Sequence, residues 1–328
     1  MGDSKYAYPT GALRAKENTI IDRHKINSLA DAENEYALLN LLRETIYGDF
    51  ITEETTPSSF ENILSLTFQR ECNFIKEITP EPNITNLFFL KYDFFNAKAL
   101  MKSSILDVQT ENLYKDIGLI SIDDLKSYIN EESKPKLNNA LKETLDSIIK
   151  DKKNINLFEI ETRLDKSYLH YALEQSDHYL LLKDFHKSWI DLTNICSFLR
   201  FKLDSDEIEL FKYSFVYGGY LEKSVFLNLW KEEMLKSSDF SNRYKSLIET
   251  ALEEYQKEKT LEIMEKGKDN FLLKKLQNAK YLSFAPEPFY AFLLARENEI
   301  KILRILFVGM INKMSREKIR KMLRVSYV

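Results

Sequence analysis

The sequence predicts an all-α protein, and three observations support this prediction. Glycine and proline are scarce, at 8 and 7 of 328 residues, so the backbone has few points at which a long element must end. Apolar residues recur at helical spacing, and no segment alternates clearly enough between apolar and polar residues to predict a strand. The hydrophobic content of 44%, with 12% aromatic residues, is sufficient for a packed core.

Three of the predicted helices have recognisable signals at their starts. Ser28 and Asp31 form a capping-box pattern ahead of an apolar stripe (Tyr36, Leu38, Leu39, Leu41, Leu42 and Ile46). Ser121 and Asp124 repeat this pattern before Leu125, Tyr128 and Ile129. Pro288 suits the first turn of a helix that runs on to residue 310. These signals predict helix starts in the first third, the second third and the last part of the chain.

An internal repeat is the most informative feature of the sequence. Residues 90–102 read LKYDFFNAKALMK and residues 188–200 read SWIDLTNICSFLR. In this pairing Asp93 matches Asp191, and Asn96 matches Asn194. A third, weaker copy is LARENEIKILRI at residues 294–305. There Glu299 takes the place of the asparagine, and Lys301 matches Lys98.

The three copies divide the chain into similar parts. They recur about every 100 residues, and each is followed by a glycine and a short amphipathic segment, which begin at Gly118, Gly218 and Gly309. We therefore predict three helical repeats, at residues 1–108, 109–214 and 215–328. If neighbouring repeats bury equivalent faces, they form a pseudo-threefold cone or funnel around an axis.

Composition and charge exclude several classes of protein. The net charge of −4, from 47 basic and 51 acidic residues, is not that of a nucleic-acid-binding protein. Cys72 and Cys196 lie far apart, which argues against a disulfide framework and indicates a reducing cytoplasm. The longest uncharged stretch has roughly nine residues, against about 18–20 for a membrane span, so no direct membrane span is expected.

No catalytic or cofactor-binding constellation is visible. The pair Gly267–Lys268 is followed by Asp269 and lacks the earlier glycine of a phosphate-binding loop. His170, His178 and His186 are evenly spaced, but on one helix neighbours would lie about 12 Å apart, which is too far to share a metal ion. Adjacent acidic residues on a helix point in different directions and make poor acid–base pairs. We expect no cofactor, no metal and no enzymatic activity.

Three stretches of the sequence resemble one family. They are YAYPTGALRAKE at residues 6–17, KYDFFNAKALMK at residues 91–102, and ARENEIKILRILFVGMINKMSREKIRKMLRVSYV at residues 295–328. The chain resembles, over its whole length, the C subunit of the bacterial and archaeal V/A-type ATP synthases, which is related to the d subunit of the eukaryotic vacuolar ATPase. The last stretch is the most specific, and it includes Glu297, Asn298, Arg304, Arg320 and the terminal Tyr327–Val328.

The resemblance implies a non-catalytic subunit of a rotary motor. It implies a three-domain helical cone in the central stalk, on the cytoplasmic face of the membrane, that binds neither nucleotide nor metal. One end would sit on the membrane proteolipid ring, and a socket at the other would receive the central shaft subunits, so that the protein couples the two during ion transport. The alternative is a generic all-helical repeat scaffold or adaptor that binds neither partner.

The candidate partner-binding residues come from the repeat and from the C-terminal segment. The repeat residues would line the socket in one interpretation and form interhelical packing pairs in the other, and the second is favoured (Asp93, Asn96, Lys98, Asp191, Asn194, Glu299 and Lys301). The C-terminal candidates, Arg316, Arg320 and Arg324, would meet an anionic membrane surface or an acidic partner, or simply face solvent. The aromatics around Gly218 (Tyr213, Phe215, Tyr217 and Tyr220) are expected to be core residues.

Overall fold

The computed structural model describes residues 4–106, 114–152, 154–232, 235–236 and 240–328. Within these ranges all regular structure is helical and no strand occurs, which confirms the all-α prediction. The chain divides into two compact units. Unit 1 comprises residues 1–85 and 244–328, and unit 2 comprises residues 86–243. The predicted boundary at 108/109 lies outside the described residues, and the division into three repeats stays a prediction.

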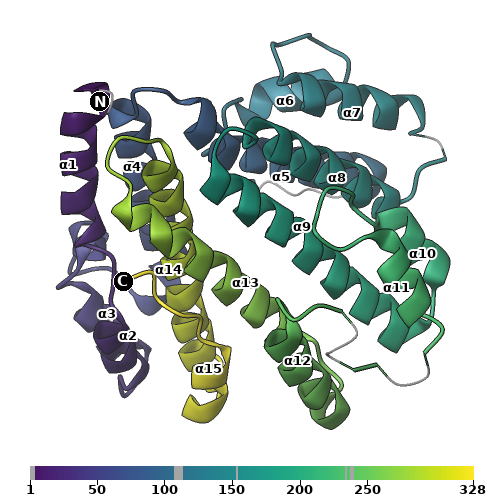
Figure 1. Ribbon diagram of the computed structural model, residues 1–328. Coiled ribbons are helices and arrows are strands. Elements are labelled where there is room, and N and C mark those ends of the chain that lie inside the picture. The colour runs from purple at the N-terminus through teal and green to yellow at the C-terminus, as the bar shows by residue number, and fades with distance from the viewer. Residues whose placement is uncertain (1–3, 107–113, 153, 233–234, 237–239) are drawn as a thin grey trace. The chain divides into compact units, whose positions relative to one another are not determined.

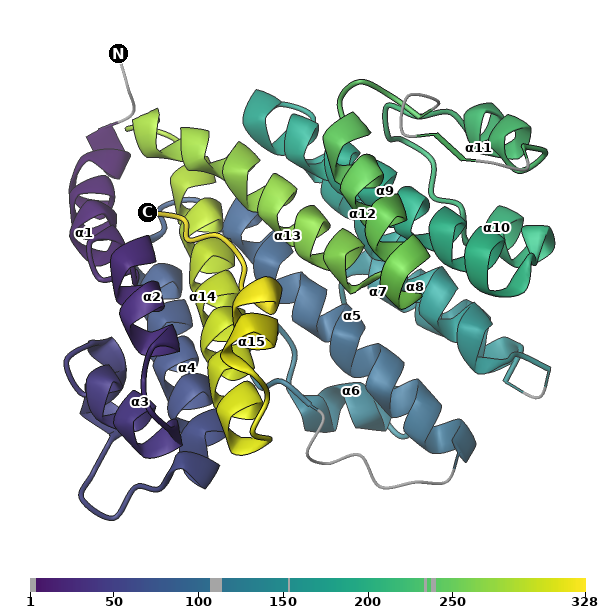
Figure 2. The same ribbon diagram turned by 90° about the horizontal axis from the view of Figure 1, so that it is seen from below.

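Unit 1 is formed by both ends of the chain. Its first part contains η1 (Ser4–Tyr6), α1 (Ala7–Glu17), α2 (Arg23–Ala30), α3 (Glu35–Leu42), η2 (Ile46–Phe50), η3 (Pro57–Ser59) and α4 (Phe60–Ile78). Its second part contains α12 (Lys245–Glu258), α13 (Glu262–Leu276), η7 (Gln277–Tyr281), α14 (Glu287–Ile311) and α15 (Arg316–Met322). The long helix α14 packs along α4 and also contacts α1, α3, α13 and α15 (Figures 1 and 2).

The core of unit 1 follows from the apolar faces of α4 and α14. The side chains of Leu64, Phe68 and Ile75 on α4 are buried, as are Leu303 and Phe307 on α14. The rings of Phe60 and Phe307 stack with their centroids 5.0 Å apart. Segments from opposite ends of the sequence therefore share one core.

Unit 2 contains the middle of the chain. Helix α5 (Asn83–Leu106) begins just before its boundary, and α6 (Ile122–Ile129), α7 (Asn139–Lys150), α8 (Leu157–Gln175) and α9 (Leu180–Arg200) follow. A π-helical turn η5 (Phe201–Ser205), then α10 (Ile208–Ser214) and α11 (Lys223–Leu229), complete it. Helix α8 packs against both α7 and α9 (Figure 1). One apolar cluster joins α5, α6, α7 and α8, and it includes Phe94, Leu125, Leu145 and Leu164.

Two of the three predicted helix starts are confirmed and one is wrong. The Ser121 side chain accepts the Asp124 N–H at the start of α6, and Pro288 lies in the first turn of α14. Ser28, by contrast, lies inside α2. Helix α3 is capped by Asn34, whose side chain accepts the N–H groups of Tyr36 and Ala37. Asparagine is as good an N-cap as serine, and it stands directly before the apolar stripe.

The predicted short segment after each repeat copy is also confirmed. The long helices α5, α9 and α14 each contain one copy, and the short helices α6, α11 and α15 follow them. The glycines differ in place, because Gly118 and Gly218 lie in loops whereas Gly309 lies inside α14. The Gly309 position faces Ile319, and an added Cβ would lie 2.6 Å from that side chain, so this glycine permits α14 and α15 to pack closely.

Candidate partner-binding sites

In the first repeat copy, two buried side chains of α5 bond to the backbone of the segment ahead of α6. Asn96 Nδ2 donates to the Lys115 carbonyl at 2.9 Å, and the Lys115 N–H donates to Asn96 Oδ1 at 2.9 Å. Asp93 Oδ1 accepts the N–H groups of Leu119 at 2.9 Å and Ile120 at 3.2 Å. The segment is thus attached to α5 at both of its ends.

The second copy repeats this arrangement on α9. Asn194 Nδ2 donates to the Val216 carbonyl at 2.7 Å, and the Val216 N–H donates to Asn194 Oδ1 at 2.8 Å. Asp191 Oδ1 accepts the Leu221 N–H at 2.9 Å. Asp191 and Asn194 are at most 1% exposed. The matched residues of the repeat therefore have matched structural roles.

A glycine lies against the aspartate in both copies. A Cβ added to Gly118 would lie 2.0 Å from Asp93 Oδ1, and a Cβ added to Gly219 would lie 2.1 Å from Asp191 Oδ1. Real Cβ atoms do not approach a carboxylate oxygen this closely, so any side chain would displace the loop or the aspartate. We name the two attached segments loop A (residues 115–120) and loop B (residues 216–221).

The third copy differs, because Glu299 belongs to a buried ionic network. Arg296 Nη1 donates to Glu299 Oε1 at 2.5 Å, and Arg296 Nη2 lies 3.3 Å from Glu71 Oε2 on α4. The Tyr47 hydroxyl donates to Glu299 Oε1 at 2.6 Å. The pKa of Tyr47 is raised well above its usual value by burial and by the Glu299 charge. Lys16 of α1 pairs with Glu71 at 2.8 Å and extends the network.

The asparagine of the third copy is shifted by one position. Asn298 Nδ2 donates to the Val325 carbonyl at 2.8 Å, and the Val325 N–H donates to Asn270 Oδ1 at 2.9 Å. Two asparagines thus do together what one does in each of the other copies. Tyr327, two residues after Val325, is buried, and its carbonyl accepts hydrogen bonds from the side chains of Gln277 and Lys280.

The two lysines of the repeat lie nearer the surface. Lys98 pairs with Asp165 at 2.6 Å, and Lys301 lies 3.4 Å from Asp269. Their side chains are 23% and 42% exposed. Ion pairs near the surface contribute little to stability, about 0–1 kcal/mol each, and a role of these two lysines in partner contact stays a prediction.

The basic side chains of α15, and that of Arg324 just after it, make most of their contacts within unit 1. Arg316 donates to the Ala32 carbonyl at 3.3 Å, Arg320 pairs with Asp31, and Arg324 lies 3.2 Å from Asp269. Lys321 pairs with Glu254 and with Glu258 of α12. These contacts hold α15 against the α2–α3 connection on one side and the α12–α13 hairpin on the other.

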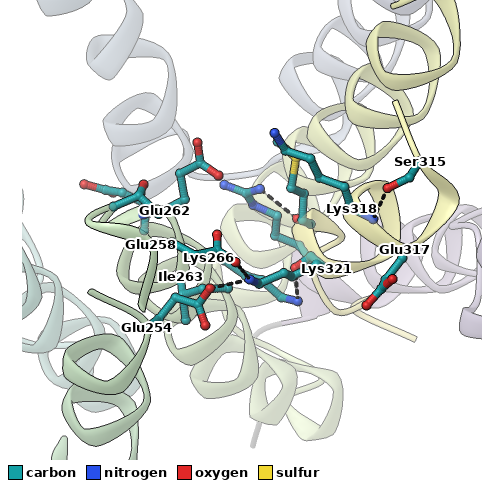
Figure 3. A pocket seen from close by; sticks show the side chains of 13 residues that line it. Glu254, Glu258, Glu262, Ile263, Lys266, Ser315, Glu317, Lys318 and Lys321 are labelled. Atoms are coloured by element: carbon teal, nitrogen blue, oxygen red, sulfur yellow. Dashed lines mark hydrogen bonds and ion pairs between the residues drawn. The ribbon is translucent and has the colours of Figure 1, made fainter. Parts of the chain in front are cut away.

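A groove of about 540 Å³ lies between α15 and the α12–α13 hairpin. Figure 3 shows glutamates on its α12 and α13 wall facing lysines on its α15 wall. The ion pairs of Lys321 cross the groove. Lys318, on the same helix, is exposed.

The aromatic prediction around Gly218 is wrong for three of its four residues. Phe215 is buried, but Tyr213, Tyr217 and Tyr220 are 38%, 57% and 42% exposed. Tyr217 and Tyr220 belong to loop B, whose ends are fixed and whose middle projects outward. The prediction rested on the usual burial of aromatic side chains, and it fails here because Tyr217 and Tyr220 lie on a projecting loop and Tyr213 lies near the end of α10.

The three spaced histidines lie on α8, on α9 and in the turn between them rather than on one helix. His186 is fully buried, and its Nδ1 forms a 2.7 Å hydrogen bond with Ser176 Oγ. Burial lowers its pKa to about 3. Among the described residues, no group of three or more histidine, cysteine or acidic side chains is placed to hold a metal ion.

These observations define the class of protein. It is an all-helical chain in which buried polar side chains fix loops and join distant segments, and among its described residues no helix has the length and apolar character to cross a membrane. The family model described as ATP synthase (C/AC39) subunit matches residues 9–322, and the chain belongs to this family. Members of this family are structural rather than catalytic parts of the complex.

Relatives support the same assignment. The chain is 27% identical to the C subunit of the V-type sodium ATPase of Enterococcus hirae, over 96% of this chain and 97% of that one. It is 26% identical to the C subunit of the A-type ATP synthase of Methanocaldococcus jannaschii, over 97% of this chain and 86% of that one. The protein is therefore a subunit of a rotary ATPase of the V/A type.

Sequence reasoning missed most of the buried network. Arg296 is fully buried and is the centre of the network, and in the third copy it stands at the place of Asp93 and Asp191, where the residue types do not match. Its partner Glu71 lies 225 positions away in the sequence. The available signal in the sequence was an arginine within the apolar stripe that became α14. If such a residue is buried, it requires an acidic partner.

Proposed function

We propose that this protein is the non-catalytic central-stalk subunit that couples the rotating shaft subunits to the membrane proteolipid ring. One observation carries the proposal: the family match extends over residues 9–322, and the relatives from Enterococcus hirae and Methanocaldococcus jannaschii are covered over 97% and 86% of their length. A chain that matches nearly the whole length of these subunits is expected to have a similar role. Its place is then peripheral, at the cytoplasmic face of the membrane complex.

The buried hydrogen bonds and ion pairs of the protein support a role in transmitting torque. A torque-bearing subunit must resist deformation, and buried hydrogen bonds and ion pairs hold their partners in one geometry. In unit 1 the network of Arg296 joins α14 to α4 and to the segment before α2. In unit 2 Asn96 and Asn194 fix two loops to their helices.

The decisive experiment is reconstitution. Purified protein is mixed with the shaft subunits of its own complex, and separately with the detergent-solubilised proteolipid ring, at low salt. Binding is measured by size-exclusion chromatography and by interferometry, and we expect a stable complex with each. A protein that binds neither partner while retaining its helical circular dichroism spectrum would instead be a generic scaffold or adaptor.

The same assay tests the basic helix α15. Reversal of Arg320 or Arg324 would place a glutamate beside Asp31 or Asp269, so loss of binding could reflect a local loss of structure. Lys318 is exposed on the same helix, and Lys318→Glu reverses a charge without breaking an ion pair that the structure shows. The matched control is Lys274→Glu on α13, which is also exposed.

If α15 meets an acidic partner, Lys318→Glu is expected to weaken complex formation several-fold at low salt, with the difference vanishing as salt rises. Equal binding of the Lys318→Glu and Lys274→Glu variants would assign α15 to the internal packing of unit 1 alone. Thermal melts of both variants check that the fold is unchanged.

A further inference from the structure

We propose that loop B is a preorganised docking loop that presents Tyr217 and Tyr220 to a carboxylate-bearing protein surface on another subunit of the complex. In this proposal the matched Asp191 and Asn194 of the repeat are positioning residues. They were candidates for the partner interface, with a packing role favoured, and the structure buries them and bonds them to the loop from within. The proposal rests on the proposed function, since the partner belongs to the same rotary complex.

Loop B is fixed at both ends and projects in its middle. Asn194 bonds both backbone groups of Val216, and Asp191 bonds the N–H of Leu221. Val216 is 2% exposed and belongs to the apolar cluster of unit 2. Gly218 has a φ of +101°, a backbone conformation that favours glycine. The loop conformation is therefore set before any partner arrives, which reduces the entropy lost on binding.

The exposed side chains of the loop are suited to binding. Tyr217 and Tyr220 are 57% and 42% exposed, and Tyr213 at the end of α10 is 38% exposed. Tyrosine supplies a large contact area at a small cost in side-chain entropy, and it is enriched where interfaces have their strongest contacts.

Cations accompany each of these rings. Lys166 lies 5.2 Å from the Tyr213 ring centre, and Lys223 lies 5.8 Å from that of Tyr217. The Tyr220 ring has the Arg243 guanidinium at 4.2 Å and the Lys187 ammonium at 5.1 Å.

The charges indicate which surface would dock on loop B. Asp184 pairs with Arg243 at 3.0 Å and accepts from the Tyr220 hydroxyl at 2.7 Å. Lys166, Lys187 and Lys223 add further positive charge beside the rings. An aromatic surface bordered by cations complements carboxylates set among apolar side chains.

Loop A has the same attachment but a different tip. Asn96 and Asp93 hold its ends, and Leu119, at 48% exposed, is its projecting apolar residue. Tyr114 and Ile120 pack against the same apolar cluster that contains Val216. Loop A thus has the attachment of loop B without its tyrosines, and it serves as an internal comparison.

The first test removes the rings. The double variant Tyr217→Ala with Tyr220→Ala is compared with wild type and with Tyr36→Ala, which removes a 60% exposed tyrosine from α3 of unit 1. Affinity for the shaft subunits and for the proteolipid ring is measured separately. We expect at least a tenfold loss of affinity for one of the two in the double variant and no change for Tyr36→Ala.

The second test disturbs the loop without touching its side chains. Gly219→Ala places a Cβ against the Asp191 carboxylate, whereas Gly11→Ala adds one where nothing lies within 4 Å. We expect Gly219→Ala to weaken the same interaction as the double tyrosine variant and Gly11→Ala to leave it unchanged. If Gly219→Ala melts too low to assay, the tyrosine variant decides alone.

The outcomes separate the two proposals. Wild-type protein that binds neither partner would remove the proposed function itself. Wild-type binding with equal affinity in the double tyrosine variant would overturn the docking loop alone. Vesicles with anionic lipid serve as a third arm, and binding to them that disappears in the double variant would assign loop B to a lipid surface and overturn the protein docking proposed here.

Discussion

The long helices of the two units use their buried carboxylates in different ways. In unit 2, Asp93 and Asp191 accept backbone N–H groups of loops that lie 26 and 30 residues further along the chain. In unit 1, Glu299, which takes the place of the asparagine in the third copy, accepts the Ile21 N–H across 278 residues and pairs with Arg296. Unit 2 uses its buried carboxylates to fix local loops, whereas unit 1 uses them to join the two ends of the chain.

This difference has an energetic consequence. A carboxylate that accepts backbone N–H groups is stabilised by fixed dipoles close to it in the sequence. A buried ion pair requires both partners at once, because removal of one leaves an uncompensated charge in the interior. Unit 1 should therefore be more sensitive than unit 2 to loss of a single buried polar side chain.

The largest expected effect is the loss of Arg296. Arg296→Met removes the positive charge between Glu71 and Glu299 and keeps much of the volume, and we expect a loss of about 3–5 kcal/mol in the free energy of unfolding. Urea unfolding followed by circular dichroism measures it. The control is Arg304→Ala, whose ion pair with Glu61 is exposed and should contribute less than about 1 kcal/mol. Similar losses in both variants would contradict the assigned role of the network.

The next largest effect concerns the uncharged asparagine that fixes loop B in unit 2. Asn194→Ala leaves the N–H and the carbonyl of Val216 without their partner, and both are buried, so we expect a loss of about 2–4 kcal/mol. Asn298→Ala in unit 1 removes a bond to one carbonyl, and about 1–2 kcal/mol is expected. The same unfolding assay ranks them. A larger loss for Asn298→Ala would mean that the C-terminal segment depends on this bond more than loop B depends on its two.

Much of the fold could be predicted from the sequence because it depends on local patterns. The helical class, the start of α14 at Pro288 and the capping box of Ser121 all rest on residues close together in the chain. The equivalence of Asn96 and Asn194 was also predictable, since matched residues in matched helices have matched surroundings. The failure at Ser28 came from a pattern that fits a cap but stands within α2.

The remaining features depend on contacts between distant parts of the chain. No local pattern connects Tyr47, Glu71 and Arg296, because chain topology alone brings them together. Likewise, the exposure of Tyr217 follows from the attachment of loop B to α9 and not from its neighbours in the sequence. Sequence reasoning identified the matched residues, but whether they touch a partner or position a loop depends on burial.

A third effect concerns acid sensitivity, which should be greater in unit 2. His186 is buried there and its pKa is about 3, whereas His24 of unit 1 is exposed. Below pH 6.5 the unfolded chain binds a proton that the folded state does not. Stability is therefore present above pH 6.5 and is lost as pH falls toward 3. From pH 7 to pH 5 the loss is about 2 kcal/mol for this residue, since one pH unit corresponds to about 1.36 kcal/mol.

The measurement compares urea unfolding of wild type and His186→Phe at pH 7 and pH 5. The variant is expected to be less stable at pH 7, because Ser176 Oγ loses one of its two hydrogen-bond partners, but to lose about 2 kcal/mol less on acidification. His24→Phe is the control, because it removes an exposed histidine of unit 1. Equal acid losses in wild type and His186→Phe would show that the histidine is protonated without cost in the folded state.

The smallest expected effect is the relief of backbone strain at one residue in each unit. It should be the same in both units, because it does not depend on their buried charges. Lys259 ends α12 in unit 1 with a φ of +54°, and Glu131 follows α6 in unit 2 with a φ of +59°. This left-handed conformation costs a residue with a Cβ about 1 kcal/mol relative to glycine. Lys259→Gly and Glu131→Gly should therefore each stabilise the fold, by about 0.5–1 kcal/mol after the greater entropy of glycine in the unfolded chain is counted. Both residues stand outside the buried networks, and a thermal melt of each variant measures the gain. A clear gain in one unit with a loss in the other would show that the units differ in their backbone as well as in their buried charges.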